Sequence, residues 1–457
     1  MSNNELKKVL IIAYYFPPIG GGGVQRTVKF AKYLPEFGWE PIILTVKDVA
    51  YRSYDPTPFD EVPGARVVRT GSLDPFRLGR LASNAIGRSR PEYDETEVLR
   101  SFRDLEVRAP GRTAGTKTGY GHFAAASKYF FVPDVQVAWA PFALLKALKI
   151  CRRDDIEAVY TTSPPESAHL VGLAIKRSTG LPWVADFRDV WGGAFWRRGL
   201  PLVYRQLNRR LEESVLRNAD GLVLNTKPPL EKVRSFRRAQ APTVVIPNGF
   251  DPSDFEGKPV ERSGDEFIIA HFGNFGAGLT AAAVLRAFAS AGEENAAFSE
   301  RARLYLMGVN SAEDMAEAKR LGIDGKVVFA GYLPHREGVR FCKAADLLLL
   351  IMAPTFEAER VPGKLYEYMG SGKPVLAAVP EGEAARLVRS VYGGESVVDP
   401  ADVGRIARRF VEEFERWRKG VTVAAPDPAL ISQFDRRRLT SRLAALLDDA
   451  ADGTRQV

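Results

Sequence analysis

Two series of short apolar segments alternate with longer helical patterns along this chain, and this alternation limits the fold more than any other feature of the sequence. The first series begins with a strand-like segment at residues 9–14, a glycine loop at 20–23 and a helical pattern at 24–37. The second series begins at Phe267 and repeats the order of strand, loop and helix. Strands that alternate with helices form parallel sheets through βαβ units. The sequence therefore predicts an α/β fold with two doubly wound, Rossmann-like domains.

A polar segment separates the two series. It occupies residues 248–266 and reads NGFDPSDFEGKPVERSGDE. Because domain boundaries fall in exposed polar linkers, we expect an N-terminal domain over residues 1–247 and a C-terminal domain over residues 248–430. Residues 47–128 are rich in Arg, Gly, Pro and Ser and lack sustained periodicity. We therefore expect an irregular insertion there, within the first domain.

The charge of the chain indicates an anionic partner without identifying it. The sequence contains 64 Lys and Arg against 56 Asp and Glu, a formal net charge of +8. Fixed positive charge concentrates phosphorylated substrates, polyanions and anionic membrane surfaces alike. The arginines are scattered through helical patterns, and no aromatic-rich binding signature accompanies them, which argues against a nucleic-acid-binding protein.

Cysteine usage and hydropathy favour a cytoplasmic protein that does not cross a membrane. Cys151 and Cys342 lie far apart without metal-ligand spacing, so we expect neither a disulfide framework nor a zinc site. The first residues run directly into a strand, and no cleavage site of a secretory signal follows. The most apolar stretches, residues 135–145 and 347–356, are shorter than the roughly 20 residues that a membrane-spanning helix needs.

Four consecutive glycines follow the first predicted strand and precede the first predicted helix. Backbone N–H groups at Gly21, Gly22 and Gly23 can donate hydrogen bonds to an anion or to the polar edge of a sugar at this helix N-terminus. The dinucleotide fingerprint separates its glycines as G-x-G-x-x-G, so a dinucleotide cofactor is not expected. A tight turn that serves only packing explains these glycines equally well.

A second candidate site lies in WVADFRDVW, residues 183–191. Asp186, Arg188 and Asp189 stand at the end of a predicted strand, where open α/β sheets bind ligands. The same three residues also fit a structural ion pair that holds the loop. His169, in the neighbouring TSPPESAHL, is more typical of a packed or capping residue than of a catalyst.

The most informative segment is ERVPGKLYEYMGSGKPV, residues 359–375. Glu359 and Glu367 are separated by seven residues, and Lys364 lies between them. A nucleotide sugar needs a carboxylate that accepts its ribose hydroxyls, and a cation or a helix N-terminus for its diphosphate. An amphipathic helix whose charges face water would show the same charges.

This segment resembles the E-x7-E element of retaining glycosyltransferases of family 4, in which the pattern P-x-K-L-Y-E-Y-x-x-x-G-K-P-V is common among bacterial members. Five further segments occur before it in the order expected for that family: AYYFPPIGGGGVQR, SPPESAHLVG, DFRD, IPNGFD and GNFG. The resemblance covers most of the chain and leaves out residues 47–128. It implies the GT-B fold, in which two Rossmann-like domains face each other across a cleft. It also implies a final helix within residues 431–457 that crosses back to the first domain.

The resemblance implies roles for individual residues of the second domain. Glu367 would accept the ribose hydroxyls, Lys364 would neutralise the diphosphate, and Glu359 would lie near the donor sugar. Many relatives bind phosphate with an Arg and a Lys after the first strand of this domain, whereas GNFGAGLTAAAVLR offers neither before Arg286. Phosphate binding would then depend on Lys364 and on the backbone amides of residues 273–276.

Three groups of site residues follow from the motifs and the resemblance together. The predicted catalytic residues are Glu359, Lys364, Arg188 and Asp189. The predicted donor-binding residues are Glu367, Gly273, Asn274, Gly276, Leu365 and Tyr366. The predicted acceptor or sugar loop comprises Gly21, Gly22, Gly23, Asp186 and His169. Relatives often carry a histidine where this chain has Asp186 or Arg188, so the group that contacts the donor sugar stays open.

The resemblance implies a hexosyltransferase that moves a sugar from a nucleotide-sugar donor to an acceptor hydroxyl with retention, in exopolysaccharide, lipopolysaccharide or glycolipid assembly. We expect no cofactor, and no metal ion, because no Asp-x-Asp motif is placed to bind one. The expected partners are the donor and a sugar or lipid-linked acceptor, with no nucleic acid. Since fold does not fix function, a nucleotide-sugar epimerase is the alternative enzyme and a basic nucleic-acid-binding protein the alternative of another class.

A basic and aromatic run suits an anionic membrane surface near a lipid-linked acceptor. It reads FWRRGLPLVYRQLNRR, residues 195–210, and we consider it together with residues 129–142. This predicts a peripheral protein at the inner face of the membrane. A solvated helix beside a buried aromatic residue fits the same sequence.

Overall fold

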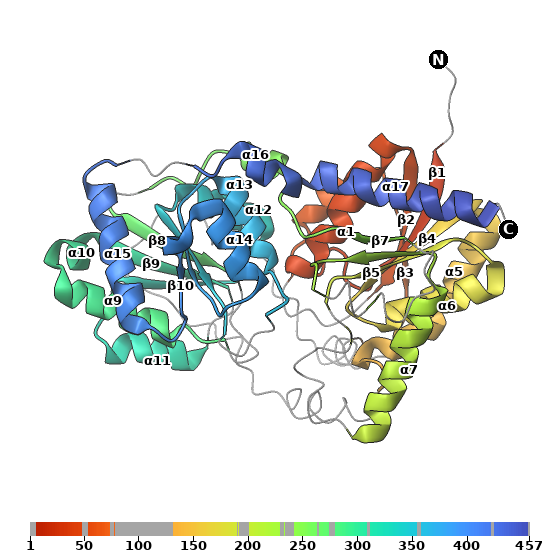
Figure 1. Ribbon diagram of the computed structural model, residues 1–457, viewed down its shortest axis with the longest axis horizontal. Helices are drawn as coiled ribbons and strands as arrows, with labels where there is room; N and C mark the ends of the chain where they lie inside the picture. The colour runs from red at the N-terminus through yellow and green to blue at the C-terminus, as the bar shows by residue number, and fades with distance from the viewer. Residues whose placement is uncertain are drawn as a thin grey trace, which may run out of the picture. The chain divides into compact units, whose positions relative to one another are not determined.

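The computed structural model divides into two units, each of which is described by itself (Figure 1). Unit 1 comprises the described residues up to Gly249 and from Arg436 onward, and unit 2 comprises those from Phe250 to Asp435. The structure describes residues 6–47, 54–73, 77, 131–189, 191, 201–228, 233, 242–262, 265–273, 279–308, 311–353, 358–421 and 425–455.

Unit 1 is built on a seven-stranded parallel sheet with the order β3-β2-β1-β4-β5-β6-β7. Its strands are β1 (Lys7–Ile12), β2 (Trp39–Val46), β3 (Arg66–Thr70), β4 (Ile156–Ser163), β5 (Trp183–Phe187), β6 (Gly221–Leu224) and β7 (Thr243–Val245). Its helices are α1 (Gly22–Tyr33), α5 (Ala140–Arg153), α6 (Ser167–Thr179), α7 (Leu202–Asn218) and α17 (Arg436–Arg455), with short 3-10 turns η1 (Leu34–Phe37), η2 (Thr57–Glu61) and η3 (Val135–Trp139). The strand order reverses direction between β1 and β4, which is the position where open α/β sheets bind ligands.

The alternating side chains of β1 explain why helices cover both faces of this sheet. Leu10 and Ile12 belong to a buried cluster with residues of α5 and α6. Val9 and Ile11 point to the opposite face and join a cluster with α1 and α17. Because successive strand side chains point to opposite faces, a strand buried on both sides reads as the continuous apolar run VLII.

The edge strand β3 corrects one expectation. We expected irregular structure from residue 47, but Arg66–Thr70 pairs in parallel with β2. The sequence RVVRT is short, and only its last residue is buried, so it lacks the apolar run of an inner strand. Of the expected insertion, residues 48–53, 74–76 and 78–128 lie outside the described part.

Unit 2 contains a six-stranded parallel sheet with the order β10-β9-β8-β11-β12-β13. Its strands are β8 (Phe267–Phe272), β9 (Ala302–Met307), β10 (Val327–Gly331), β11 (Leu347–Ile351), β12 (Val375–Ala378) and β13 (Val397–Val398). Its helices are α9 (Ala282–Glu294), α10 (Ala296–Arg301), α11 (Ala312–Arg320), α12 (His335–Ala344), α13 (Gly363–Ser371), α14 (Glu383–Tyr392), α15 (Val403–Arg418) and α16 (Pro428–Ile431), with 3-10 turns η6 (Pro252–Phe255), η7 (Gly394–Ser396) and η8 (Ser432–Phe434). Here the strand order reverses between β8 and β11.

Two helical layers also cover the sheet of unit 2. One buried cluster joins the sheet to α9, α10, α11 and α15, and another joins it to α12, α13 and α14. The two doubly wound parallel sheets confirm the prediction of an α/β fold with two Rossmann-like units. Within the described part of the chain, no helix is both long and apolar enough to cross a bilayer.

The last helix of the chain packs in unit 1. Leu439, Leu443 and Leu447 of α17 are buried in the same cluster as Val28 of α1 and Val9 of β1. Polar contacts add to this packing, since Lys7 donates a hydrogen bond to Asp448 over 2.8 Å.

A buried ion pair connects α1 to β5 inside unit 1. The Arg26 guanidinium donates to both carboxylate oxygens of Asp186, with N–O distances of 2.7 and 2.8 Å, and the two side chains are 1% and 0% exposed. Tyr160 and Thr162 of β4 also donate to Asp186, over 2.5 and 3.1 Å. Burial alone would raise the pKa of Asp186, but the Arg26 charge and these hydrogen bonds hold it below its ordinary value.

Replacing Arg26 with Met should lower the free energy of unfolding of unit 1 by about 3–5 kcal/mol, because Asp186 would be left as an uncompensated buried charge. Urea denaturation followed by circular dichroism measures this change. Arg66→Met, which removes an exposed ion pair to Asp154, is the matched control and should have a much smaller effect. An Arg26→Met protein as stable as the wild type would contradict the prediction.

Candidate functional site

The carboxyl ends of β8 and β11 bring together a lysine and a buried histidine in unit 2. His271 of β8 is fully buried, and its Nδ1 lies 2.8 Å from the carbonyl oxygen of Leu349 in β11. A carbonyl only accepts, so Nδ1 carries the hydrogen and the neutral ring presents Nε2 as an acceptor. The Lys364 ammonium at the start of α13 lies 3.1 Å from this Nε2 and donates to it.

The environment shifts the pKa of both groups. Burial, followed by the charge of Lys364, lowers the pKa of His271 well below its ordinary value, so the imidazole is neutral near pH 7. Burial also lowers the pKa of Lys364 to about 8, although Glu367 partly offsets the effect. Lys364 therefore remains mainly protonated at neutral pH and loses its charge in mildly alkaline solution.

Gly273 makes room for the lysine. Its φ of +147° is disfavoured for residues with a side chain, and a Cβ at this position would lie 2.2 Å from Lys364 Nζ. The backbone around it is anchored, because Gly273 N donates to Met307 O over 2.7 Å and Phe272 N donates to the Tyr368 hydroxyl over 2.8 Å. The backbone at Gly273 is thereby held in a position that leaves a passage for the Lys364 stem.

Glu367 lies one turn after Lys364 on α13 and has a histidine partner. His335 Nε2, at the first residue of α12, lies 2.8 Å from Glu367 Oε1. The two side chains keep 13% and 16% exposure, so the carboxylate is neither buried nor fully solvated. A carboxylate oriented in this way can accept hydroxyl hydrogens from a ligand.

The other predicted residues of unit 2 are distributed differently. Glu359 lies on an exposed turn just before α13. Leu365 and Tyr366 were expected to bind the donor, but their side chains are 0% and 2% exposed and belong to the core. This expectation is wrong for their side chains, because the apolar face of α13 packs inward and Tyr366 stacks edge-on against Phe434. Two further predicted donor-binding residues, Asn274 and Gly276, lie outside the described residues.

In unit 1, Arg188 braces the predicted glycine loop. Its Nε donates to Ser163 O over 2.8 Å, its Nη2 to Pro164 O over 2.7 Å, and its Nη1 to Gly23 O. These bonds join the segments that follow β1, β4 and β5. Burial lowers the pKa of Arg188 from its ordinary value. The guanidinium is half-buried and holds backbone in place.

The glycine loop itself begins α1 without a side-chain cap. Gly21 precedes the helix with a φ of 104°, a backbone conformation that favours glycine. Gly22 and Gly23 form the first turn, and a Cβ on Gly23 would lie 3.0 Å from Arg188 Nη1. Asp189, half-buried after β5, stands beside Arg188 in the chain.

Two residues predicted for the acceptor or sugar loop are core residues instead. Asp186 is fully buried with its oxygens bonded to Arg26, Tyr160 and Thr162, so the sugar-loop assignment is wrong. Asp186 forms its ion pair with Arg26 of α1, whereas Arg188, the partner that the sequence suggested, bonds to backbone carbonyls. His169 is also fully buried, lies 2.7 Å from Thr161 Oγ1, and packs on Phe187 and Trp191.

Burial lowers the pKa of His169 to about 3, which keeps its imidazole neutral at physiological pH. A side chain with no exposed surface cannot contact a sugar, so His169 is corrected from a candidate ligand contact to a packed residue.

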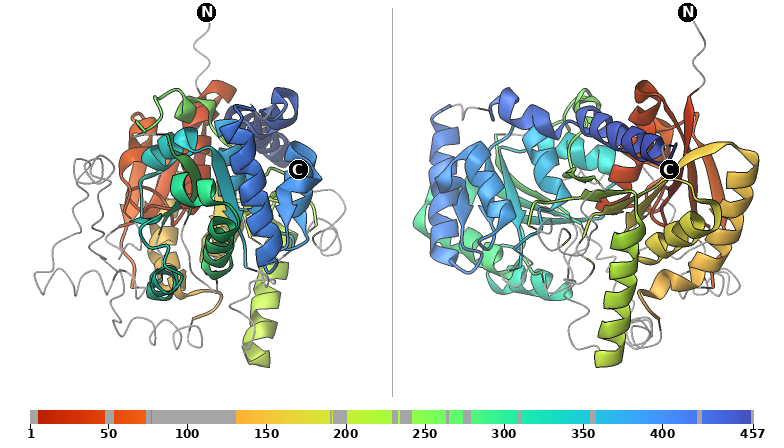
Figure 2. Two further views of the ribbon diagram at one scale, coloured as in Figure 1. Left: turned by 90° about the vertical axis from the view of Figure 1, so that its left-hand side faces the viewer. Right: turned by 45° about the vertical axis from the view of Figure 1, so that its right-hand side comes forward.

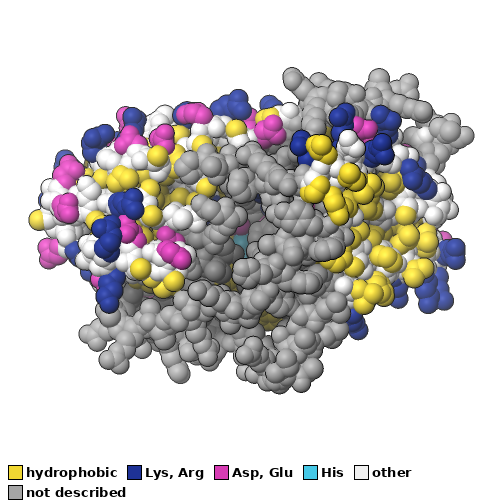
Figure 3. All heavy atoms as spheres, turned by 90° about the horizontal axis from the view of Figure 1, so that it is seen from below, with side chains coloured by type: hydrophobic (Ala, Val, Ile, Leu, Met, Phe, Trp, Pro, Cys, Tyr) yellow, Lys and Arg dark blue, Asp and Glu magenta, His cyan; other side chains and the backbone are white. Residues whose placement is uncertain are grey.

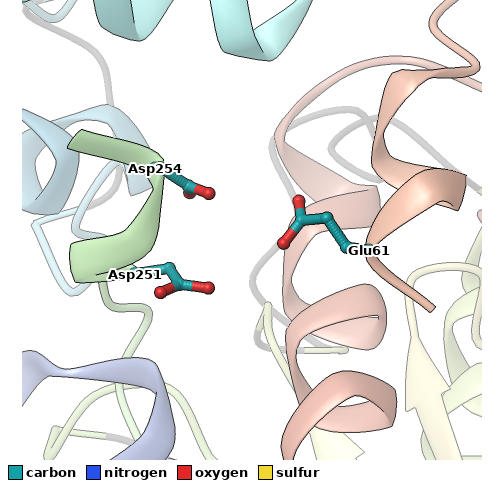
Figure 4. Close-up of side chains that lie close together, drawn as sticks. All are labelled: Glu61, Asp251 and Asp254. Carbon is teal, nitrogen blue, oxygen red and sulfur yellow. The ribbon is translucent and has the colours of Figure 1, made fainter. Parts of the chain in front are cut away.

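Three acidic residues carry carboxylates of the kind that bind metal ions, and each is described with its own unit. Figure 4 shows Asp251 and Asp254 at η6 of unit 2 and Glu61 at η2 of unit 1. Glu61 accepts from Lys29 and Lys32 over 2.6 and 3.1 Å. Asp251 accepts from the backbone N and the hydroxyl of Ser253, over 3.0 and 2.8 Å. We assign no metal to these carboxylates.

Sequence analysis missed His271 and His335. They are 93 and 32 residues away from the side chains that they contact, Lys364 and Glu367. One signal was present: a histidine interrupts the otherwise apolar strand FIIAHF. A polar residue in a strand buried on both faces needs a hydrogen-bond partner.

Comparisons with known proteins agree with this architecture. Residues 87–249 match the model of the glycosyl transferase 4-like domain, and residues 266–415 match the model of glycosyl transferases group 1. No curated protein matches the chain by sequence at a significant level.

Several solved structures share the fold at low identity. HepE from Anabaena, in complex with UDP and glucose, has a TM-score of 0.63 at 18% identity, covering 97% of this chain and 99% of that one. Sucrose-phosphate synthase from Thermosynechococcus elongatus has a TM-score of 0.55 at 17% identity, covering 98% of both chains. WaaG, a glycosyltransferase involved in lipopolysaccharide biosynthesis, has a TM-score of 0.53 at 14% identity, covering 97% of this chain and 98% of that one.

The two family models follow one another in the chain: the first includes strands β4 to β7 of the unit 1 sheet, and the second includes all strands of the unit 2 sheet. The parallel α/β architecture of both units is that of the GT-B structures above. This chain is therefore a GT-B glycosyltransferase of the family 4-like type.

Proposed function

We propose that the protein transfers a hexosyl group, with retention, from a nucleotide-sugar donor to an acceptor hydroxyl. The observation that carries this proposal is the pairing of a cation and a carboxylate, Lys364 and Glu367, on one turn of α13 at the reversal point of the unit 2 sheet. In such a pair, the cation can bind the diphosphate of a nucleoside diphosphate and the carboxylate can accept from its ribose hydroxyls.

The roles of the two side chains follow from their chemistry. Lys364 contacts the diphosphate of the donor, and its charge becomes more valuable as negative charge grows on the departing diphosphate. Glu367 accepts hydrogen bonds from the ribose hydroxyls, and His335 orients the carboxylate through its contact with Oε1. We assign Glu359, on its exposed turn, to the donor sugar, as the resemblance to the family implies. Lys364 supplies the positive charge in this scheme, so we propose a reaction without a metal ion or a cofactor.

The solved relatives support a nucleotide-sugar donor. HepE is described in complex with UDP-glucose and with UDP and glucose. WaaG is described as involved in lipopolysaccharide biosynthesis. We therefore propose a role in the assembly of a polysaccharide, a lipopolysaccharide or a glycolipid, with a sugar or a lipid-linked acceptor.

We further propose that unit 1 rests on an anionic membrane surface through the first turns of α7. Leu202 and Val203 are 69% and 72% exposed, and Leu207 is exposed as well. Arg205 and Arg209, next to Leu207 in the helix, are also exposed. This end of α7 extends away from the sheet of unit 1 (Figure 2). Exposed apolar side chains among arginines suit an interface that offers both acyl chains and negative charge.

Helix α5 adds to this surface. Phe142 and Leu145 are 38% and 73% exposed. Seen from below, hydrophobic side chains gather on the unit 1 side with Lys and Arg at their margin (Figure 3). The part of the run at residues 192–200, together with residues 129 and 130, lies outside the described residues.

Replacing Glu367 with Ala should weaken binding of the preferred nucleoside diphosphate about ten- to a hundredfold, because a charge-assisted hydrogen bond contributes about 1.5–3 kcal/mol. Calorimetry with uridine, guanosine and adenosine diphosphate first identifies the nucleotide and then measures the loss. Glu383→Ala on α14 is the matched control, since this glutamate pairs with the exposed Arg386. Wild-type affinity in Glu367→Ala would refute the ribose assignment.

The pKa of Lys364 predicts a pH dependence of catalysis. The lysine is charged below about pH 8 and neutral above it, so kcat/KM for the donor should fall about tenfold per pH unit in more alkaline solution. Lys364→Arg should remove this decline while the protein stays active, since a guanidinium keeps its charge. Lys373→Met, at another lysine with a lowered pKa, should retain the decline. If kcat/KM of Lys364→Arg still declines in alkaline solution, the decline belongs to the titration of another group.

The membrane proposal predicts preferential binding to anionic vesicles. Replacing Arg205, Arg209 and Arg210 together with Gln should weaken binding to phosphatidylcholine vesicles that contain phosphatidylglycerol by about a hundredfold, because each basic residue contributes about 1 kcal/mol. Sedimentation with the vesicles measures the bound fraction.

The same triple substitution at Arg405, Arg408 and Arg418, which are exposed on α15 of unit 2, is the charge-matched control and should bind as the wild type does. Equal binding of the wild type to neutral and anionic vesicles at low salt would contradict the proposal.

A further inference from the structure

We propose that His271 is a positioning residue, which holds the Lys364 ammonium over Gly273 by accepting its hydrogen bond at Nε2. The inference rests on the proposed function in one respect, the assignment of Lys364 to the donor diphosphate. His271 itself touches neither donor nor acceptor in this scheme. It acts through the lysine.

The imidazole is held rigidly enough to serve this purpose. It is fully buried in β8, and its Nδ1 donates to Leu349 O over 2.8 Å. The same carbonyl also accepts from the Tyr368 hydroxyl over 3.3 Å, so one backbone oxygen of β11 receives donors from β8 and from α13. The hydrogen bond from His271 Nδ1 to Leu349 O fixes both the orientation and the tautomer of the ring, which leaves Nε2 as an acceptor that points at Lys364.

A lysine requires such an anchor more than an arginine would. Its four-carbon stem is flexible, and its ammonium has no fixed geometry of its own. Here the stem passes through the space where residue 273 has no side chain, with Cε 2.5 Å and Nζ 2.2 Å from the position of an added Cβ. Gly273 permits this path, and His271 ends it with a defined hydrogen bond.

Among the groups that face Lys364, His271 is the one that accepts its hydrogen bond without carrying a charge. Glu367 on the same helix supplies a carboxylate, and Cys342 comes from α12. Burial raises the pKa of the Cys342 thiol well above its ordinary value, so the thiol carries no charge. The imidazole thus stabilises the ammonium without cancelling its charge, which leaves that charge available to an anion.

Two conservative substitutions separate this role from a merely structural one. The amide nitrogen of Asn in His271→Asn can replace Nδ1 and keep the bond to Leu349, but Asn does not reach the position of Nε2. The longer side chain of Gln in His271→Gln can place its amide oxygen near that position and accept from Lys364. A positioning role therefore predicts that Gln preserves function better than Asn, whereas a role limited to anchoring β8 on β11 predicts the reverse.

The experiment measures kcat, KM and the affinity for the preferred nucleoside diphosphate, from pH 6.5 to 9.5, with thermal unfolding as a check of folding. His271→Asn should reduce kcat about ten- to a hundredfold, the value of one hydrogen bond to a charged group, and should move the alkaline decline of kcat/KM to lower pH. In His271→Gln, kcat and the pH at which kcat/KM declines should both stay close to the wild-type values. An Asn variant equal to the wild type, or superior to Gln, would overturn the proposal.

A Lys364→Met background completes the test. If His271 acts through the lysine, His271→Asn should cause little further loss there, and the two effects should be far from additive. Full additivity would overturn the positioning role while leaving the donor assignment intact. Wild-type nucleotide affinity and turnover in Lys364→Met would instead refute the proposed function itself. Lys373→Met controls for the loss of a partly buried lysine from the same unit.

Discussion

The buried bond between Arg26 and Asp186 determines much of how unit 1 presents its loops. Arg26 stands one turn into α1, just after the glycines, and Asp186 stands near the end of β5. Tyr160 and Thr162 of β4 complete the shell of this carboxylate. Because a desolvated charge is costly without its partners, α1 cannot shift along the sheet without exposing or breaking the cluster. The position of the glycine loop is thereby fixed by a fully buried salt bridge, and Arg188 adds a second contact to this loop through Gly23 O.

Much of the fold could be predicted from the sequence, because parallel strands buried on both faces appear as short apolar runs between helical patterns. The segments VLII and LLLLI are examples. The edge strand β3 was not predicted, because edge strands need little burial and therefore lack a long apolar run. In RVVRT, an arginine flanks the two valines on each side. The order of the strands was also inaccessible, since the placement of β1 and β8 in the middle depends on crossovers that a single sequence does not specify.

The candidate site was partly predictable, for a different reason. Lys364 and Glu367 lie close together in one helix, so their joint appearance is visible in a short motif. Their histidine partners come from other elements, and tertiary contacts of this kind leave no local pattern. Leu365 was assigned to the ligand because of its place in the motif, although its apolar side chain fits the helix face that packs inward. Asp186 was misassigned in the same way, since a carboxylate at a strand end can serve a ligand or an internal guanidinium equally well.

The shared space of Gly273 and Lys364 restricts how this site can evolve. A side chain at position 273 would occupy the volume of the lysine stem and would also have to adopt an unfavourable backbone conformation. Selection can therefore change the two positions only in one order: the lysine must first be lost or shortened, and only then can the glycine vary. Among descendants of this sequence, the two sites should covary although 90 positions lie between them, and a lineage that moves its cation to another position should be recognisable because position 273 is then free to vary.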